Sequence, residues 1–182
     1  MARLSGKIAF ITGAAGGIGR STCARYIAEG ARIVAADISG PALDETLEEA
    51  KAGENGLPLV CDITDPEQVK AAMAKTVSEF GKLDILCNIA GGSSSADARV
   101  TDAPDEEFWR VIKLDLYGTF LCSKYAIPEM VRSGGGSVVN LSSMVALMAL
   151  PERDCYTAAK GGVAAMTRSM AVEYAPDNIR VN

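Results

Sequence analysis

The stretch Thr12-Gly13-Ala14-Ala15-Gly16-Gly17-Ile18-Gly19 joins a short apolar run, residues 7–12, to a helical pattern over residues 17–29. Glycines at this density permit a tight turn and a close approach of the backbone to a ligand. The helix that follows offers free N–H groups and the positive end of its dipole, which together can bind a pyrophosphate. The stretch therefore predicts a strand, a phosphate-binding turn and a helix, in that order.

Short apolar runs and longer helical patterns alternate along the rest of the chain. The expected strands are residues 7–12, 32–37, 57–61, 83–88, 137–142 and 178–182. The expected helices are residues 17–29, 41–52, 66–80, 104–132 and 154–174, and a polar loop spans residues 91–103. Almost wholly apolar strands are typical of parallel sheets buried on both faces, and their alternation with helices predicts βαβ units. We therefore expect an α/β fold with a doubly wound, Rossmann-like parallel sheet in three layers, αβα.

The chain reaches Asn182 inside the sixth expected strand. An unfinished strand leaves backbone groups without partners. We therefore expect residues 1–182 to form a single dinucleotide-binding and catalytic domain that is truncated in its sixth strand and lacks further C-terminal strands and a substrate lid.

Composition and charge exclude several classes of function. Lys and Arg number 18 against 23 Asp and Glu, a net charge of −5, and no basic run is present, so nucleic acid and anionic membrane are poor partners. The chain contains no histidine, which excludes Ser-His-Asp hydrolysis, Cys-His proteolysis and His-ligated zinc. The sequence shows neither a secretory signal at its start nor an apolar run long enough to span a membrane.

The five cysteines are widely spaced and form no C-x-x-C pattern: Cys23, Cys61, Cys87, Cys122 and Cys155. An odd number of scattered cysteines fits neither a disulfide framework nor a metal site. We expect small buried thiols in a reduced, cytoplasmic protein without a bound metal.

An acidic residue, Asp37, ends the second expected strand eighteen positions after Gly19. A carboxylate in this place can accept hydrogen bonds from both hydroxyls of an adenosine ribose, and it repels a 2′-phosphate. The neighbouring positions carry Gly16 and Ile38, and neither position holds an Arg or Lys that would attract such a phosphate. The sequence therefore predicts NAD, rather than NADP, as the cofactor.

These motifs resemble those of the short-chain dehydrogenase/reductase family, and the resemblance covers the whole chain. The glycine turn is similar to the family's T-G-x-x-x-G-I-G. The segment Asn88-Ile89-Ala90-Gly91 resembles its N-N-A-G motif, with Ile89 in place of the second Asn. The segment Tyr156-Thr157-Ala158-Ala159-Lys160 resembles its Y-x-x-x-K.

Three further segments follow the family's order. Asp62-Ile63 resembles its adenine-contacting acidic position, Leu141-Ser142-Ser143 its serine strand end, and residues 178–182 the start of its N-I-R-V-N-x-x-x-P-G segment. The resemblance implies a set of cofactor-binding residues: Gly13, Gly16, Gly17, Ile18, Gly19, Asp37, Ile38, Asp62, Ile63, Asn88, Ala90, Gly91, Tyr156 and Lys160.

Tyr156 and Lys160 stand four residues apart on an expected helix, so they share one face. An ammonium beside a phenol lowers the pKa of the phenol, which then donates a proton to a ketone oxygen or accepts one from an alcohol. By resemblance, Lys160 also bonds the nicotinamide ribose, and Ser143 hydrogen-bonds the substrate oxygen. We therefore expect Ser143, Tyr156 and Lys160 to be catalytic.

Asp115 departs from the family pattern. The family carries an Asn at this place, which holds a water in a proton relay to the lysine, whereas this chain reads Lys113-Leu114-Asp115-Leu116-Tyr117-Gly118. A carboxylate can accept a hydrogen bond from water and pair with Lys160, but it cannot donate as an amide does. We include Asp115 among the catalytic residues and expect its charge to hold the pKa of Tyr156 higher.

The favoured function is an oxidoreductase that transfers a hydride between NAD(H) and a small-molecule secondary alcohol or ketone. One alternative is a 3-oxoacyl thioester reductase, although such reductases more often prefer NADP, which Asp37 disfavours. Another is a nucleotide-binding module without turnover, which Asp115 and the chain end at Asn182 favour. An epimerase or dehydratase is disfavoured, because those relatives generally have a G-x-x-G-x-x-G turn and a longer chain.

A self-association surface is expected on the helix over residues 104–132. Apolar side chains occupy more than one of its faces: Phe108, Trp109, Ile112, Leu116 and Phe120. One face packs on the sheet, and another can meet a partner. Together with the resemblance, this pattern predicts a homodimer or homotetramer with a two-fold interface built from this helix and the Tyr156 helix.

Overall fold

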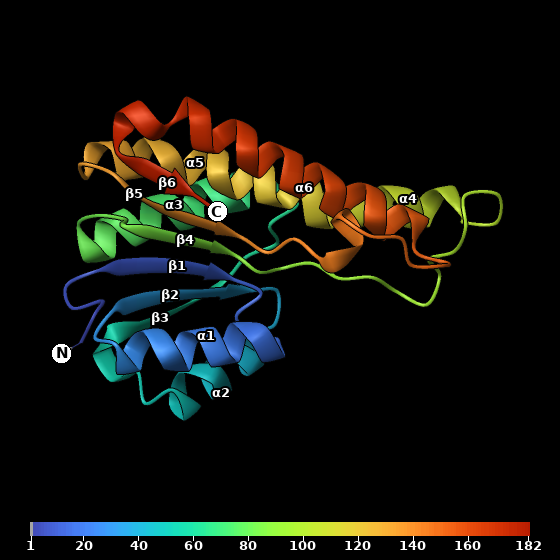
Figure 1. The fold of residues 1–182 in the computed structure, drawn as a ribbon. Coiled ribbons are helices and arrows are strands. Elements are labelled where there is room, and N and C mark those ends of the chain that lie inside the picture. The colour runs from blue at the N-terminus through green and yellow to red at the C-terminus, as the bar shows by residue number, and fades with distance from the viewer. Residues whose placement is uncertain (1) are drawn as a thin grey trace.

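The computed structural model describes residues 2–182, in which a six-stranded parallel sheet lies between two layers of helices (Figure 1). The strands are β1 (Ile8–Thr12), β2 (Arg32–Asp37), β3 (Gly56–Val60), β4 (Ile85–Asn88), β5 (Gly136–Asn140) and β6 (Ile179–Val181). They lie in the order β3-β2-β1-β4-β5-β6, and each neighbouring pair is parallel. The predicted doubly wound α/β fold is confirmed.

Helices cover the two faces of the sheet (Figure 1). The helices α1 (Gly17–Ala28) and α2 (Gly40–Glu49) lie against one face, and α3 (Pro66–Phe80), α5 (Gly118–Arg132) and α6 (Asp154–Glu173) lie against the other. The helix α4 (Asp105–Val111) precedes α5, and short 3₁₀ turns span Gly53–Asn55, Met144–Ala146 and Ala175–Asp177. Within residues 2–182, none of the helices has both the length and the apolar character needed to cross a membrane.

Successive residues of the central strands face two separate cores. On β1, Phe10 packs in the core that contains α3 and α5, whereas Ala9 and Ile11 pack in the core that contains α1 and α2. The five cysteines are buried and unpaired, as predicted, and four of them belong to these two cores.

The strand β3 is an exception to burial on both faces. It lies at the edge of the sheet, and Val60 keeps 66% of its surface exposed. Pro58, which has no N–H to donate, fits an edge strand. The predicted double burial is therefore wrong for β3, and also for β5, where Val139 keeps 40% of its surface exposed, because an apolar run does not reveal how far the helices cover a strand.

The helix expected over residues 104–132 is interrupted by a π-helical turn. The helix α4 ends at Val111, the π-helical turn η2 spans Ile112–Tyr117, and α5 begins at Gly118. Such a turn contains an extra residue and rotates the side chains that follow it, and it often lies at a functional site. The fully buried Asp115 is part of this turn.

Candidate active site

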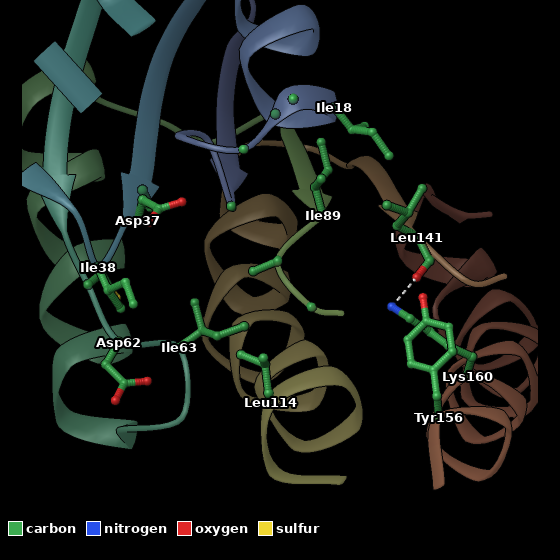
Figure 2. A pocket seen from close by; sticks show the side chains of 18 residues that line it. Ile18, Asp37, Ile38, Asp62, Ile63, Ile89, Leu114, Leu141, Tyr156 and Lys160 are labelled. Atoms are coloured by element: carbon green, nitrogen blue, oxygen red, sulfur yellow. Dashed lines mark hydrogen bonds between the residues drawn. The ribbon is translucent and has the colours of Figure 1, made fainter. Parts of the chain in front are cut away.

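A cleft of about 420 Å³ opens at the carboxyl ends of the strands, where the strand order reverses between β1 and β4. In open α/β sheets this is the place at which ligands bind. Asp37 and Asp62 lie on one side of the cleft and Tyr156 and Lys160 on the other (Figure 2). Most residues of the predicted cofactor set line it: Gly13, Gly16, Gly17, Ile18, Gly19, Asp37, Ile38, Asp62, Ile63, Ala90, Gly91, Tyr156 and Lys160.

The glycine turn packs closely on one side and is open on the other. Gly13 has a φ of +65°, and a Cβ at this residue would lie 2.8 Å from the backbone of Ala90. A Cβ at Gly19 would collide with the carbonyl oxygen of Gly13. A Cβ at Gly17, by contrast, would meet no atom within 4 Å. The open space therefore lies over the N-terminus of α1, where the helix dipole favours a pyrophosphate.

Two backbone amides orient the carboxylate of Asp37 at the end of β2. It accepts hydrogen bonds from Ala15 N at 3.1 Å and from Ser39 N at 3.2 Å. The cation of α1 close to this turn, Arg20, donates to the Ala15 carbonyl and pairs with two glutamates of α2, at 3.0 and 3.4 Å. Its charge is therefore compensated, so the surroundings of Asp37 suit ribose hydroxyls better than an added phosphate.

Apolar side chains form the walls of the cleft near the two acidic residues. In Figure 2, Ile38 lies between Asp37 and Asp62, and Ile63 and Leu114 lie side by side further into the cleft. The carboxylate of Asp62 accepts a hydrogen bond from Thr64 N at 2.8 Å, which fixes its position. Apolar walls of this kind can enclose the faces of a purine ring.

Lys160 is buried and held at both its side chain and its backbone. Its Nζ donates to the carbonyl oxygen of Leu141 at 2.8 Å, the bond drawn in Figure 2, and lies 2.9 Å from Asp115 Oδ1. The hydroxyl of Ser142 donates to the carbonyl oxygen of Lys160 at 3.0 Å. The ammonium is therefore in a defined place at the end of the cleft.

Asp115 lies behind Lys160 and is completely buried. Besides pairing with Lys160, its carboxylate accepts from Gly92 N at 3.0 and 3.2 Å through its two oxygens. A Cβ at Gly91 would collide with this carboxylate, so the glycine there allows the loop to pass against it. The buried charge is thus both paired and hydrogen-bonded, which is what its burial requires.

Tyr156 lies one turn before Lys160 on α6, with its ring centre 5.6 Å from the ammonium nitrogen. Burial raises the pKa of the Tyr156 phenol, the charge of Asp115 raises it further, and a hydrogen bond with Ser143 opposes the rise. The predicted lowering of this pKa by Lys160 is therefore wrong, whereas the predicted rise from Asp115 is confirmed. The physical reason is first the burial of the phenol and second the charge of Asp115, which lies against Lys160.

Three predicted site residues lie outside the lining of the cleft: Asp115, which lies behind Lys160, Asn88 and Ser143. Asn88 is buried in β4, and its Nδ2 donates to Asn140 Oδ1 at 2.8 Å and to Ser123 Oγ at 3.3 Å, which ties β4 to β5 and α5. Ser143 begins the 3₁₀ turn Met144–Ala146 and accepts from Val145 N at 3.4 Å, and its hydroxyl opposes the rise in the pKa of Tyr156.

Several lining residues were absent from the predicted set: Ala36, Cys61, Ile89, Leu114 and Leu141. Each of them stands next to a predicted residue in the chain or in a quoted motif, which is the signal that could have found them. Leu141 contributes its backbone carbonyl to Lys160, a role that the residue type does not reveal.

Comparisons with known proteins agree with this geometry. A family model described as "short chain dehydrogenase" matches residues 7–182. "Uncharacterized oxidoreductase YxbG" of Bacillus subtilis is 43% identical, with 100% of this chain and 66% of that protein covered. "3-oxoacyl-[acyl-carrier-protein] reductase FabG" of Thermotoga maritima is 39% identical, with 99% of this chain and 73% of that protein covered. The chain therefore spans about two thirds of the length of the curated relatives it matches.

Solved structures show the same architecture. The structure titled "Crystal Structure of NAD+-Bound Xylitol Dehydrogenase" superposes with a TM-score of 0.95 at 35% identity and covers 99% of this chain and 69% of that one. A 7α-hydroxysteroid dehydrogenase complexed with NADH and 7-oxo glycochenodeoxycholic acid superposes with a TM-score of 0.93 at 34% identity, covering 100% of this chain and 70% of that one.

Proposed function

The chain belongs to the short-chain dehydrogenase family, and from this premise we propose that it is an NAD-dependent oxidoreductase that transfers a hydride between NAD(H) and a secondary alcohol or ketone. One observation carries the proposal: a single cleft has Asp37 at one end and the pair Tyr156 and Lys160 at the other. The NAD⁺ and NADH in the titles of the two solved relatives support the choice of cofactor.

The residues that line the cleft fit NAD. The open space over Gly17 would receive the pyrophosphate, and the oriented carboxylate of Asp37 would accept hydrogen bonds from the adenosine ribose. Lys160 stands where it would bond the nicotinamide ribose. When bound, NAD supplies the acceptor or donor of the hydride.

Tyr156 would move the proton that accompanies the hydride. In reduction its hydroxyl donates a proton to the carbonyl oxygen of the substrate, and in oxidation its phenolate accepts the proton of the alcohol. The hydroxyl of Ser143, which opposes the rise in the pKa of Tyr156, can donate to the same substrate oxygen and stabilise its developing charge. The raised pKa of Tyr156 keeps the phenol protonated at neutral pH, which suits reduction.

The test is to follow NADH absorbance with a panel of secondary alcohols and ketones. Tyr156→Phe removes only the hydroxyl, so we expect turnover to fall by roughly 10²–10⁴-fold, the usual contribution of a proton donor. Tyr125→Phe, which changes a partly buried tyrosine of α5 outside the cleft, serves as the matched control. Equal turnover in Tyr156→Phe and the parent would overturn the proposal.

A second candidate substrate class is the 3-oxoacyl thioester, which the 39% identity to the Thermotoga reductase favours. The reduction of the ketone group is the same in both classes, and the substrates differ in the acyl thioester attached to that group. Adding an acetoacetyl thioester to the panel, with NADH and NADPH in separate assays, distinguishes this class from simple ketones.

We also propose that the protein is a homodimer through α5 and α6. A groove of about 470 Å³ runs between these helices, and its lining is mainly apolar: Phe120, Ile127, Val131, Met166, Met170 and Tyr174. Phe120 keeps 44% and Val131 41% of its surface exposed. Apolar patches of this kind are typical of interfaces, and two copies of one face associate about a two-fold axis. Light scattering tests the state: twice 19.0 kDa is expected, and a monomer contradicts it.

We further propose a cytoplasmic location. The five cysteines are all free and buried, which fits a reducing compartment. Fractionation of the source cells tests this: recovery of the protein outside the cytoplasmic fraction contradicts it.

A further inference from the structure

The loop that connects β4 to α4 accepts hydrogen bonds from the free N–H groups at the start of α6, the helix that carries Tyr156. The first N–H groups of a helix have no partner within it. In α6, Asp154 N donates to the Ala98 carbonyl at 3.3 Å, Cys155 N to Asp97 Oδ1 at 3.1 Å, and Tyr156 N to Asp97 Oδ2 at 3.0 Å. Two adjacent loop residues, more than fifty positions earlier in the chain, thus accept all three bonds.

The residues of α6 itself do not provide this cap. Arg153, in the N-cap position, makes no side-chain capping bond. Asp97 is only 5% exposed, so its carboxylate is committed to these two amides. In return, Asp154 Oδ2 accepts from Val100 N at 2.7 Å. The loop and the helix start therefore hold each other reciprocally.

The first residues of the same loop are hydrogen-bonded to groups around Lys160. Gly92 N donates to Asp115, which pairs with Lys160, and the Gly92 carbonyl accepts from Arg110 Nη2 at 3.1 Å. The loop over residues 91–103 is consequently anchored behind Lys160 near its start, through Gly92, and at the first turn of α6 near its middle, through Asp97 and Ala98.

Tyr156 depends on the Asp97 cap more than Lys160 does. Tyr156 is the third residue of α6 and lies in its first turn, which frays when a cap is removed. Lys160 lies one turn further, and it is held independently by the Leu141 carbonyl, by Asp115 and by Ser142. Removing the cap should therefore move Tyr156 while leaving Lys160 in place.

We propose that Asp97 is a positioning residue, whose carboxylate fixes the first turn of α6 and so sets the place of the Tyr156 hydroxyl at the cleft without touching cofactor or substrate. This inference rests on the proposed function, in which Tyr156 carries the proton. A misplacement of a reacting group by about 1 Å can cost roughly 100-fold in rate, so a buried cap at this turn has a catalytic consequence.

Amide hydrogen exchange, measured by NMR, tests the cap without any need for turnover. In Asp97→Ala we expect exchange at Cys155 and Tyr156 to be at least about fivefold faster, the equivalent of the ~1 kcal/mol that a cap typically contributes, while the amide of Lys160 keeps its protection. Asp102→Ala, which changes an exposed residue of the same loop, is the matched control and should leave all three amides as in the parent. Unchanged exchange in Asp97→Ala, or loss of protection along the whole of α6, would overturn the proposal.

Kinetics and titration of the tyrosine then test the positioning role. In Asp97→Ala we expect kcat to fall at least tenfold while the Kd for NAD stays within twofold, and Asp97→Asn, which keeps one acceptor oxygen, should recover part of kcat. Because burial is the main cause of the raised pKa of Tyr156, a loosened turn should bring that pKa down in an NMR titration of labelled tyrosine. The charged groups that face Tyr156, Asp115 and Lys160, are unchanged in this variant.

The outcomes separate the two proposals. A kcat equal to the parent's, or an equal loss of kcat and NAD affinity, overturns the positioning role of Asp97. If the parent itself shows no turnover, the proposed function fails. Hydrogen exchange and the tyrosine titration then still decide whether Asp97 holds Tyr156, and an unshifted titration in Asp97→Ala overturns the positioning role of Asp97.

Discussion

Replacing Asp115 by Asn separates the charge of this buried side chain from its shape. The variant Asp115→Asn keeps an oxygen that can accept from Lys160 or from Gly92 N, and it removes the negative charge. The parent carboxylate lies 2.9 Å from the ammonium of Lys160 and raises the pKa of Tyr156. The substitution should therefore change both the stability of the fold and the pH at which Tyr156 ionises.

The loss of stability follows from the buried ion pair. At 2.9 Å the attraction between Lys160 and Asp115 is about 6 kcal/mol for an effective dielectric constant of about 20, before the cost of burying both charges. Removing one partner of such a pair typically costs about 3–5 kcal/mol. Because Asn still accepts a hydrogen bond, we expect about 3 kcal/mol, a fall in Tm of roughly 6–12 °C for a domain of this size.

The direction of the pH effect follows from the role of Tyr156. Alcohol oxidation needs the phenolate, so its rate rises as pH increases through the pKa of Tyr156. Asp115→Asn removes one cause of the raised pKa and frees Lys160 to stabilise the phenolate. The rise in oxidation rate should therefore occur at lower pH in the variant, and ketone reduction, which needs the protonated phenol, should also decline at lower pH.

The assay measures initial rates in both directions from neutral to strongly alkaline pH, with thermal unfolding of the same samples. Asp102→Asn, which removes a charge from an exposed residue, serves as the control. A pH profile that stays in place or moves to higher pH in Asp115→Asn would refute the electrostatic reasoning. A folded but inactive Asp115→Asn would show instead that the carboxylate has a catalytic role that an amide cannot fill.

Three other sets of substitutions have outcomes that the geometry determines. Asp37→Ser combined with Ile38→Arg should move the ratio of kcat/KM values toward NADP by roughly tenfold or more, since hydrogen bonds to charged groups contribute about 1.5–3 kcal/mol; a parent that uses both cofactors equally contradicts the argument. Gly19→Ala should destabilise the fold by about 1–3 kcal/mol in thermal unfolding, whereas Gly17→Ala should fold as the parent does and bind NAD more weakly by calorimetry; the reverse order would refute the assignment of the open space. Val131→Glu should convert the dimer to a monomer in light scattering, and an unchanged mass would place the interface elsewhere.

The cofactor half of the site could be predicted from sequence because it depends on neighbouring parallel strands. In the register of the sheet, Thr12 of β1 pairs with Ala36 of β2, so the glycine turn and Asp37 leave adjacent strands at the same edge. The spacing between the glycine turn and Asp37 along the sequence therefore correctly predicted that they lie close together. The roles of the glycines also follow from the missing Cβ alone, which is visible in any sequence.

The catalytic half could be predicted only in part, because its groups act on one another through burial. The spacing of Tyr156 and Lys160 correctly predicted a shared helix, but not that Asp115 would compensate the ammonium at 2.9 Å. The π-helical turn that contains Asp115 has no marker in a continuous helical pattern. The direction of the Tyr156 pKa was consequently wrong from sequence, since it depends on burial that only the fold reveals.

Asp97 shows most clearly what the sequence pattern conceals. Its partners are backbone N–H groups 58 and 59 positions away, and a backbone group carries no residue type to recognise. The run of small polar residues before it, Ser93 to Ser95, is typical of an exposed loop, yet Asp97 itself is buried. The sequence predicts only that this loop is polar. In the structure it hydrogen-bonds both Asp115, which pairs with Lys160, and the backbone N–H of Tyr156.

The same loop accounts for why a carboxylate is tolerated where the family has an amide. A buried charge is costly unless it is paired and hydrogen-bonded, and Asp115 is paired with Lys160 and accepts from Gly92 N through both oxygens. Gly92 can donate in this way because Gly91 lets the backbone pass against the carboxylate and Arg110 holds the Gly92 carbonyl. The charge is therefore stabilised mainly by groups that do not line the cleft, and Lys160 is the residue through which a change at Asp115 reaches the site placed to bind NAD.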